Sequence, residues 1–199
     1  GETGEATAAH VDVLLPIARA AAEPPRETAE EARNRACVEI LNLLAALETA
    51  VEAGLSEAVE VFCRVMHDED VVDLGRAAEI RHEVGRIWAV ALEGQDPLTA
   101  ARLGHLAVHV HWKAWDHATA LRIADGAMER AVEADDRGLC WDIAVTAASA
   151  AAGGRREDAI RQWLHVASPY ARDAAAHSHL IMFIAGLGRH AEASEAAEE

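Results

Sequence analysis

The sequence predicts an all-α protein. Alanine, the residue with the highest intrinsic helix propensity, occupies 46 of the 199 positions, whereas aromatic residues make up only 4%. Apolar residues recur at intervals of three and four, as in Ile40, Leu43, Leu44 and Leu47. The sequence contains no short alternating runs of Val, Ile, Thr and aromatic residues, which strands require. Closely packed helices are therefore expected, because small alanine side chains let helix axes approach one another.

The first 54 residues are expected to form an N-terminal helical segment. A first helix over 8–22 ends before Pro24 and Pro25, since proline lacks the backbone donor that a helix needs. Thr28, followed three residues later by Glu31, has the spacing of a capping box. It opens a second helix that continues to Val51, and Gly54 follows as a C-terminal cap.

From residue 55 to 199 the sequence predicts about four helix pairs that form a single continuous domain with the N-terminal segment. The phrase Gly75-Arg76-Ala77 recurs at Gly154 and Gly188, and Trp115-Asp116-His117 stands near the middle of the longer gap. The resulting intervals of 40, 39 and 34 residues are typical of a helical repeat. The expected pairs are 56–66 with 76–92, 97–112 with 116–134, 138–152 with 157–166, and 171–185 with an incomplete helix from His190.

These intervals favour a right-handed α-solenoid of antiparallel helix pairs. The alternative is a helical bundle in which the glycine spacing is accidental. Ala159 and Ala193 follow Gly154 and Gly188 at the same offset, and a small residue there lets the second helix cross the first closely. We therefore prefer the repeat interpretation.

The glycine turns and the alanines that follow them resemble tetratricopeptide repeats, although most aromatic and proline positions of that motif are absent. The units of about 40 residues, with loops such as 133–137, are similar to divergent repeats of bacterial signal-transduction ATPases and transcriptional activators. The stretch 39–47, with Ala50, Gly54 and Ala58, resembles the helix that precedes such repeats in bacterial NB-ARC-type (STAND) regulators. The resemblance implies a sensor or docking segment of a cytoplasmic regulator. The ATP site of that family is not carried over, because no GxxxxGK[ST] motif is present.

Charge and cysteine usage exclude several classes of function. The formal net charge is −16 and Lys113 is the only lysine, so the chain lacks the basic surface that binds nucleic acid. No apolar run reaches the length of a membrane span. Cys37, Cys63 and Cys140 form no CxxC pair, which favours a reducing cytoplasm. Because a helical pattern is still running at Glu199, we expect a segment of a longer protein.

The most conspicuous polar group in the sequence is a set of histidines. His105 and His109 are four residues apart and share one helix face, so they could hold a metal ion together, whereas His111 points elsewhere. The preferred interpretation is that they fill partly polar packing positions or line a groove, with no cofactor or metal. A metal-binding sensor or enzyme that uses His105 and His109 is the less favoured alternative.

We expect no catalysis by this segment and predict a protein-interaction function. Trp141 lies near the start of a first helix, where side chains tend to face the concave groove of a helical repeat. The candidate partner-binding groove consists of His105, His109, Trp141, Ser178 and Met182. The expected partner is a protein, a peptide or a neighbouring domain of the same protein. A free-standing adaptor and a homodimer formed through the incomplete last pair are alternatives.

Overall fold

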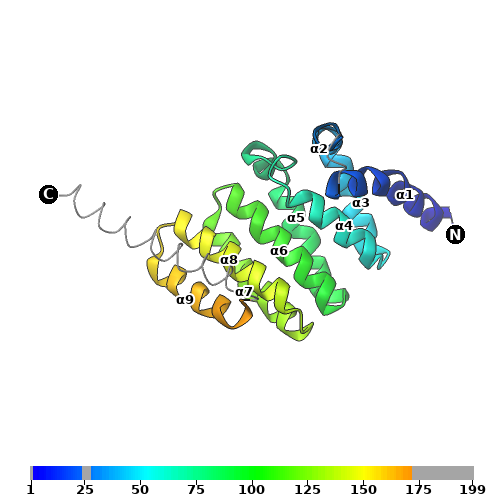
Figure 1. Cartoon of the computed structure of the whole chain (residues 1–199). Helices are drawn as coiled ribbons and strands as arrows, with labels where there is room; N and C mark the ends of the chain where they lie inside the picture. Colours follow the sequence, from blue (N-terminus) through cyan, green and yellow to red (C-terminus); the bar gives the residue numbers. More distant parts are fainter. Residues whose placement is uncertain (1, 24–27, 172–199) are drawn as a thin grey trace.

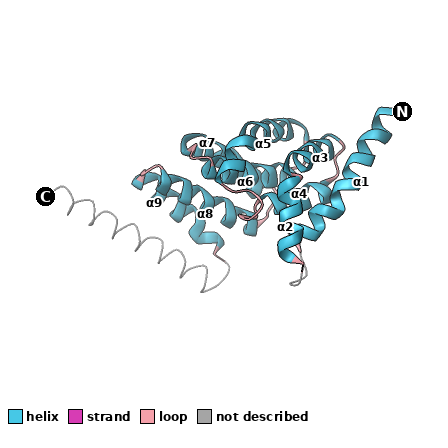
Figure 2. Ribbon diagram, turned by 90° about the horizontal axis from the view of Figure 1, so that it is seen from above, coloured by secondary structure: helices cyan, strands magenta, loops and turns pink. Residues whose placement is uncertain are grey.

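The computed structural model describes residues 2–23 and 28–171, and all regular structure in these ranges is helical. The all-α prediction is therefore confirmed (Figures 1 and 2). The helices are α1 (Glu2–Ala22), α2 (Ala29–Val38), α3 (Ile40–Glu52), α4 (Ser56–Met66), α5 (Leu74–Gly94), α6 (Pro97–Lys113), α7 (His117–Glu133), α8 (Arg137–Gly153), α9 (Glu157–Ala167) and the short 3-10 helix Ser168–Tyr170. The predicted helices over 171–185 and from His190, with Gly188, Ser178 and Met182, lie outside the described residues.

The second predicted helix is divided into α2 and α3. Glu39 ends α2 and precedes α3, with φ −91° and ψ 8°, outside regular helical geometry. The two helices differ in how much they bury: α2 buries only Ala36, whereas α3 buries seven residues. The polar α2 and the apolar α3 therefore cannot present one continuous stripe to the same core.

The helices follow one another along the molecule in chain order, from α1 at one end to α9 at the other (Figure 1). Helix α6 packs against α4 on one side and α8 on the other, and α7 packs against both α6 and α8. Helix α5 packs mainly against α3 and α6 rather than against α4. The expected close pair of 56–66 with 76–92 is thus replaced by a different arrangement, in which residues 67–73 carry the chain across. None of the described helices is long and apolar enough to cross a membrane.

Three turns in the second half of the molecule share one geometry. Helices α6, α7 and α8 each contain 17 residues, and three residues separate each helix from the next. The middle residue of each linker is left-handed: φ is 61° at Trp115, 54° at Asp135 and 53° at Arg155. The turns therefore recur every 20 residues along the chain. The sequence analysis located turns at all three places, but it did not identify the left-handed residues or the 20-residue spacing between them.

Two of the predicted turn glycines have other roles. Gly75 lies in the first turn of α5, and Gly154 has φ −80° at the end of α8, so neither supplies the left-handed residue. Gly54 is left-handed, with φ 68°, and ends α3 as predicted. Its neighbour Leu55 donates its N–H to the Ala50 carbonyl at 2.9 Å, as in a Schellman motif. The same hydrogen bond, from a backbone N–H to the carbonyl five residues earlier, closes the later turns. It joins Asp116 to His111 (2.9 Å), Asp136 to Ala131 (3.2 Å) and Arg156 to Ala151 (2.9 Å).

Aspartates begin four of the helices. Asp96 caps α6, since its side chain accepts a bond from the Thr99 N–H at 3.1 Å. The side chains of Asp73, Asp116 and Asp136 cap α5, α7 and α8 in the same way. Each carboxylate satisfies a backbone donor that the first turn leaves unpaired.

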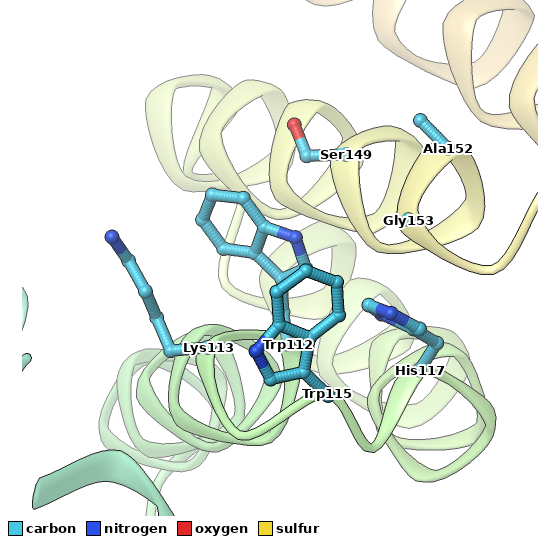
Figure 3. A pocket seen from close by; sticks show the side chains of 7 residues that line it. All are labelled: Trp112, Lys113, Trp115, His117, Ser149, Ala152 and Gly153. Atoms are coloured by element: carbon cyan, nitrogen blue, oxygen red, sulfur yellow. The ribbon is translucent and has the colours of Figure 1, made fainter. Parts of the chain in front are cut away.

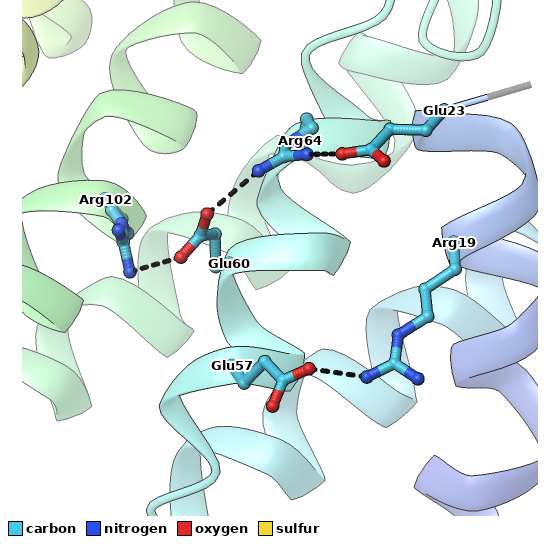
Figure 4. A network of polar contacts seen from close by, with 6 residues as sticks. All are labelled: Arg19, Glu23, Glu57, Glu60, Arg64 and Arg102. Atoms are coloured by element: carbon cyan, nitrogen blue, oxygen red, sulfur yellow. Dashed lines mark hydrogen bonds and ion pairs between the residues drawn. The ribbon is translucent and has the colours of Figure 1, made fainter.

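Ion pairs join α1, α4 and α6 on the surface of the first half (Figure 4). Glu60 on α4 accepts from both Arg64 and Arg102, at 2.9 Å each, so it links α4 to α6. The connections to α1 are Arg64–Glu23 and Arg19–Glu57. Most of these side chains are exposed, and exposed pairs contribute about 0–1 kcal/mol each. They orient the helices more than they stabilise them.

Candidate functional site

A hollow of about 400 Å³ opens where the C-terminal ends of α6 and α8 meet the turn before α7. Figure 3 shows its two indoles beneath α8, with Lys113 on one side and His117 on the other. Its lining is almost entirely apolar, and consists of Trp112, Lys113, Trp115, His117, Ser149, Ala152 and Gly153. We call this hollow the tryptophan pocket.

Trp115 combines high exposure with an unfavourable backbone conformation. It has 70% of its surface exposed and a φ of 61°. The left-handed conformation costs an L-residue roughly 1–2 kcal/mol, and glycine is the usual residue after a helix end of this kind. Its ring lies edge-on to His117, with the centroids 5.8 Å apart. The left-handed conformation belongs to the turn that Asp135 and Arg155 share, so what distinguishes Trp115 is its exposed indole, which core packing does not explain.

Trp112 and Lys113 form another wall of the pocket. Trp112 is partly buried against the core, and the Lys113 Nζ lies 5.3 Å from the centre of its ring. The same Nζ forms an ion pair with Glu69 at 2.7 Å. The ammonium is therefore already neutralised, and the wall that it helps to form is predominantly apolar.

His117 and Gly153 set the shape of the pocket beside α7. His117 is the first residue of α7, and its Nδ1 is buried without a hydrogen-bond partner among the described residues. A Cβ placed on Gly153 would lie 2.5 Å from the His117 Cε1. Any larger residue at position 153 would therefore displace the imidazole.

Three imidazoles meet behind the Trp112 wall. His67 follows the end of α4, and its ring centre lies 4.3 Å from that of His105 and 5.0 Å from that of His109, both on α6. The His67 Nδ1–H donates to the Cys63 carbonyl at 2.8 Å, and the His105 Nε2 lies 3.1 Å from the Thr146 hydroxyl of α8. The Nε2 atoms of His67 and His109 are buried and have no partner in the described part of the chain. We call these three residues the histidine cluster.

Burial lowers the pKa of every imidazole in the cluster. The pKa of His105 falls well below its ordinary value, and that of His109 falls to about 3, because burial penalises the charged form. Burial is also the main cause of the lowered pKa of His67. Mutual repulsion within the cluster and the charge of Lys113 act in the same direction on His109. The cluster is therefore uncharged at neutral pH.

The cluster touches the pocket. The His109 ring meets Trp112 edge-on, with the centroids 5.7 Å apart at 71°. Trp112 thus has the buried histidines on one side and the open hollow on the other. A movement of α6 that disturbs the cluster would be transmitted directly to the pocket wall.

The predicted pairing of His105 and His109 on one helix face agrees with the structure, but their surroundings differ from a groove. His109 is only 7% exposed and belongs to the interior. The sequence did not predict that His67 joins these two residues, because it lies 38 residues before His105 and belongs to no motif. Trp141 is partly buried against the core, and the exposed indole is Trp115 instead.

The histidine cluster does not have the arrangement of a metal site. The rings of His67 and His105 are inclined by only 31°, so they are closer to stacked than to edge-on. Nitrogen lone pairs lie in the ring plane, so stacked rings cannot direct them to one ion. Within residues 2–23 and 28–171, no group of three or more His, Cys, Asp or Glu side chains could hold a metal.

A second hollow, of about 390 Å³, lies between α5, α6 and α7. It contains His111, whose Nδ1 is 3.1 Å from the Asp116 carboxylate. Burial lowers the pKa of His111, although Asp116 opposes that effect. Asp116 also caps α7 through the Thr119 N–H. The pair therefore has a structural role in joining the end of α6 to the start of α7.

Comparison with known proteins gives no assignment. No protein-family model, curated protein or solved structure matches the chain. The geometry of the tryptophan pocket and the histidine cluster is therefore the basis on which a function can be inferred.

Proposed function

We propose that this chain is a non-catalytic protein-interaction segment, the docking or sensor arm of a bacterial cytoplasmic signalling or transcriptional regulator. In this proposal the helices form a right-handed solenoid of tetratricopeptide-like pairs. The 20-residue spacing of Trp115, Asp135 and Arg155 supports it, as do the contacts of α6 with both α4 and α8. A regular stack of this kind presents extended surfaces to a partner.

The observation that carries the proposal is Trp115. Tryptophan is among the residues most often responsible for the energy of protein interfaces. Here it is exposed beside an apolar hollow and is kept in a conformation that favours glycine. An exposed indole beside an apolar hollow is the arrangement that a partner's side chain would cover.

The lining and the charge of the chain define the chemistry of the partner. The pocket suits one large apolar side chain, because its walls are two indoles and the small residues Ala152 and Gly153. The net charge of −16 attracts a basic partner and accelerates its association. We therefore propose a peptide segment in which an aromatic or aliphatic anchor is flanked by Lys or Arg.

Peptide display tests this proposal directly. A peptide library is selected on the wild-type protein and counter-selected on Trp115→Gly. We expect enriched peptides with an apolar anchor and basic flanks, and binding should fall at least tenfold in Trp115→Gly, about 1.4 kcal/mol or more. Binding is followed by the indole N–H resonances of the five tryptophans, of which those of Trp112 and Trp115 should shift most.

Two further variants make this test specific. Gly153→Ala keeps both indoles but pushes His117 toward the hollow, so it should also weaken binding. Val90→Ser removes an apolar side chain on α5, 51% exposed and outside the pocket lining, and should leave binding unchanged. Enriched peptides that bind wild type and Trp115→Gly equally well would refute the pocket as the binding site.

Trp115→Gly is also expected to leave the fold intact. Glycine removes the steric cost of the left-handed conformation but increases the entropy of the unfolded chain, so the free energy of unfolding should stay level or rise by up to about 1 kcal/mol. Urea unfolding followed by circular dichroism measures this change. A loss of more than about 1 kcal/mol would show that the indole supports the fold, contrary to its proposed binding role.

The full-length gene distinguishes the regulator from a free-standing adaptor. The regulator proposal expects a nucleotide-binding switch domain or a DNA-binding domain upstream of this segment. If neither is encoded there, the regulator part fails, while the peptide-docking part remains open to its own test.

A further inference from the structure

We propose that His67, His105 and His109 form a proton-sensitive latch that keeps the tryptophan pocket assembled at neutral pH and releases it on acidification. The regulatory meaning of the latch rests on the proposed docking function. The opening itself does not, because it can be measured without any partner.

The latch joins three helices. His67 stands at the end of α4, His105 and His109 lie on α6, and the His105–Thr146 contact reaches α8. With ring centres 4.3 and 5.0 Å apart, the imidazoles fill the seam between α4 and α6. The seam is compatible with neutral rings, because the buried Nε2 of His109 has no hydrogen-bond partner among the described residues, and burial outweighs the backbone carbonyls that favour a charged His67.

The charged groups around the cluster oppose protonation. Lys113 on α6 faces His109, and its counter-ion Glu69 is directed to Lys113. On α4 the neighbouring ionisable group is the Cys63 thiol, which Arg102 and Glu60 influence, and α8 contributes the uncharged Thr146. In the described residues no ion pair joins a carboxylate to any of the three rings. An imidazolium here would therefore gain more from water than from its present neighbours.

Water can reach the imidazoles when α4 and α6 separate along this seam. An open form exposes the imidazoles, and each one then recovers an ordinary affinity for protons. An imidazole that stays neutral in the closed form and has an ordinary pKa in the open form favours opening. Its effect on the equilibrium is about tenfold for each pH unit below about 6.5. For His105 and His109 together, the factor at pH 5.5 is on the order of one hundred.

Opening would alter the pocket through Trp112. The edge-on contact with His109 is one of the supports of this indole, and Trp112 forms a wall of the hollow. When the seam opens and a protonated His109 ring turns toward water, Trp112 loses that support, although both residues lie on α6. The partner-binding form is thus the form in which the cluster is closed and uncharged.

Hydrogen exchange of the free protein tests the latch. Amide protection factors in α6 near His109, corrected for the intrinsic pH dependence of exchange, are measured from pH 7.5 to 5.5. We expect them to fall about tenfold or more between pH 6.5 and 5.5 in wild type. His109→Gln should reduce that fall by about tenfold, whereas His165→Gln, at an exposed position on α9, should behave as wild type.

Circular dichroism at pH 7.5 establishes that His109→Gln is folded. His105→Gln, whose amide can still bond Thr146, serves as the second variant. The wild-type measurement is decisive without either of them. Protection factors that stay constant across this pH range would overturn the latch.

The pocket is read out in two ways. The Trp112 indole N–H resonance should shift over the same pH range, and a peptide selected at pH 7.5 should bind more weakly at pH 5.5 in wild type than in His109→Gln. An opening that leaves the Trp112 resonance unchanged would overturn the link to the pocket. If no peptide binds the pocket at any pH, the docking function fails, and the exchange and indole measurements still decide the latch.

Discussion

Lowering the pH from 6.5 to 5.5 is expected to remove about 2 kcal/mol from the free energy of unfolding, because buried histidines must be neutral in the folded protein. The pKa values of His105 and His109 are lower in the folded chain than in the unfolded chain, where histidine has its ordinary value. The unfolded state therefore binds more protons throughout this interval, and stability falls as the pH falls. Over this interval His105 and His109 each contribute about 1 kcal/mol, because unfolded histidine is already half protonated at pH 6.5, and His67 adds to this loss. Urea unfolding at the two pH values measures the difference.

The pH interval separates this effect from the titration of carboxylates. Hydrogen bonds from Thr99 to Asp96, and from Thr119 to Asp116, outweigh burial and lower the pKa of each carboxyl group. Their stabilising contributions are lost only as the pH falls below about 4. A double variant, His105→Gln with His109→Gln, should have a much flatter stability profile between pH 6.5 and 5.5. An unchanged profile in that variant would mean that other groups cause the acid sensitivity.

Gly104→Ala is expected to destabilise the protein by about 2–4 kcal/mol, because the added methyl group has no room. Its Cβ would lie 2.6 Å from the Cβ of Ala127, 3.2 Å from the Ala127 Cα and 2.8 Å from the Trp88 Nε1. Both Ala127 atoms are fixed by the backbone of α7, because Cα is part of it and Cβ is bonded directly to it. The clash can therefore be relieved only if α6 and α7 move apart. This overpacking exceeds the gain of about 1 kcal/mol that alanine brings to a helix interior. Thermal and urea unfolding both report the change.

Two variants serve as controls for the crossing of α6 and α7. Gly94→Ala, at the end of α5, adds a methyl group with nothing within 4 Å, and should be neutral or slightly stabilising. Ala127→Gly combined with Gly104→Ala moves the methyl group from one helix to the other and should recover part of the loss. If Gly104→Ala is as stable as wild type, α6 and α7 are less tightly packed than the structure shows.

Local signals explain which parts of the fold were predictable. Gly54 acts within one turn of helix and ends α3 as expected, and the N-cap Asp96 before Pro97 is a signal of equally short range at the start of α6. The division of α2 from α3 at Glu39 was missed because no glycine or proline marks it, although the sequence changes there from polar to apolar. Only the packing of α3 in the core, with α2 outside it, shows where the helix must stop.

The candidate site depends on contacts between distant residues, and for this reason sequence patterns found only part of it. His105 and His109 were identified by their spacing, but His67 reaches them only through the packing of α4 on α6. Trp115 was one of five tryptophans, and nothing in its neighbourhood predicts a left-handed backbone, which a bulky residue adopts rarely. Gly104 and Gly126 make room for the Trp88 ring, and both lie inside helices, where no turn signal in the sequence identifies them.

The equal lengths of α6, α7 and α8 restrict how this chain can grow or shrink. One residue added within a helix turns everything after it by about 100° and would direct the next apolar stripe away from its neighbour. A block of 40 residues, comprising two helices and two linkers, preserves both the direction of the chain and the facing of each stripe. In the proposed solenoid, a length change by this block is the one that keeps the remaining helices facing their neighbours, so engineered versions that differ by multiples of it should fold.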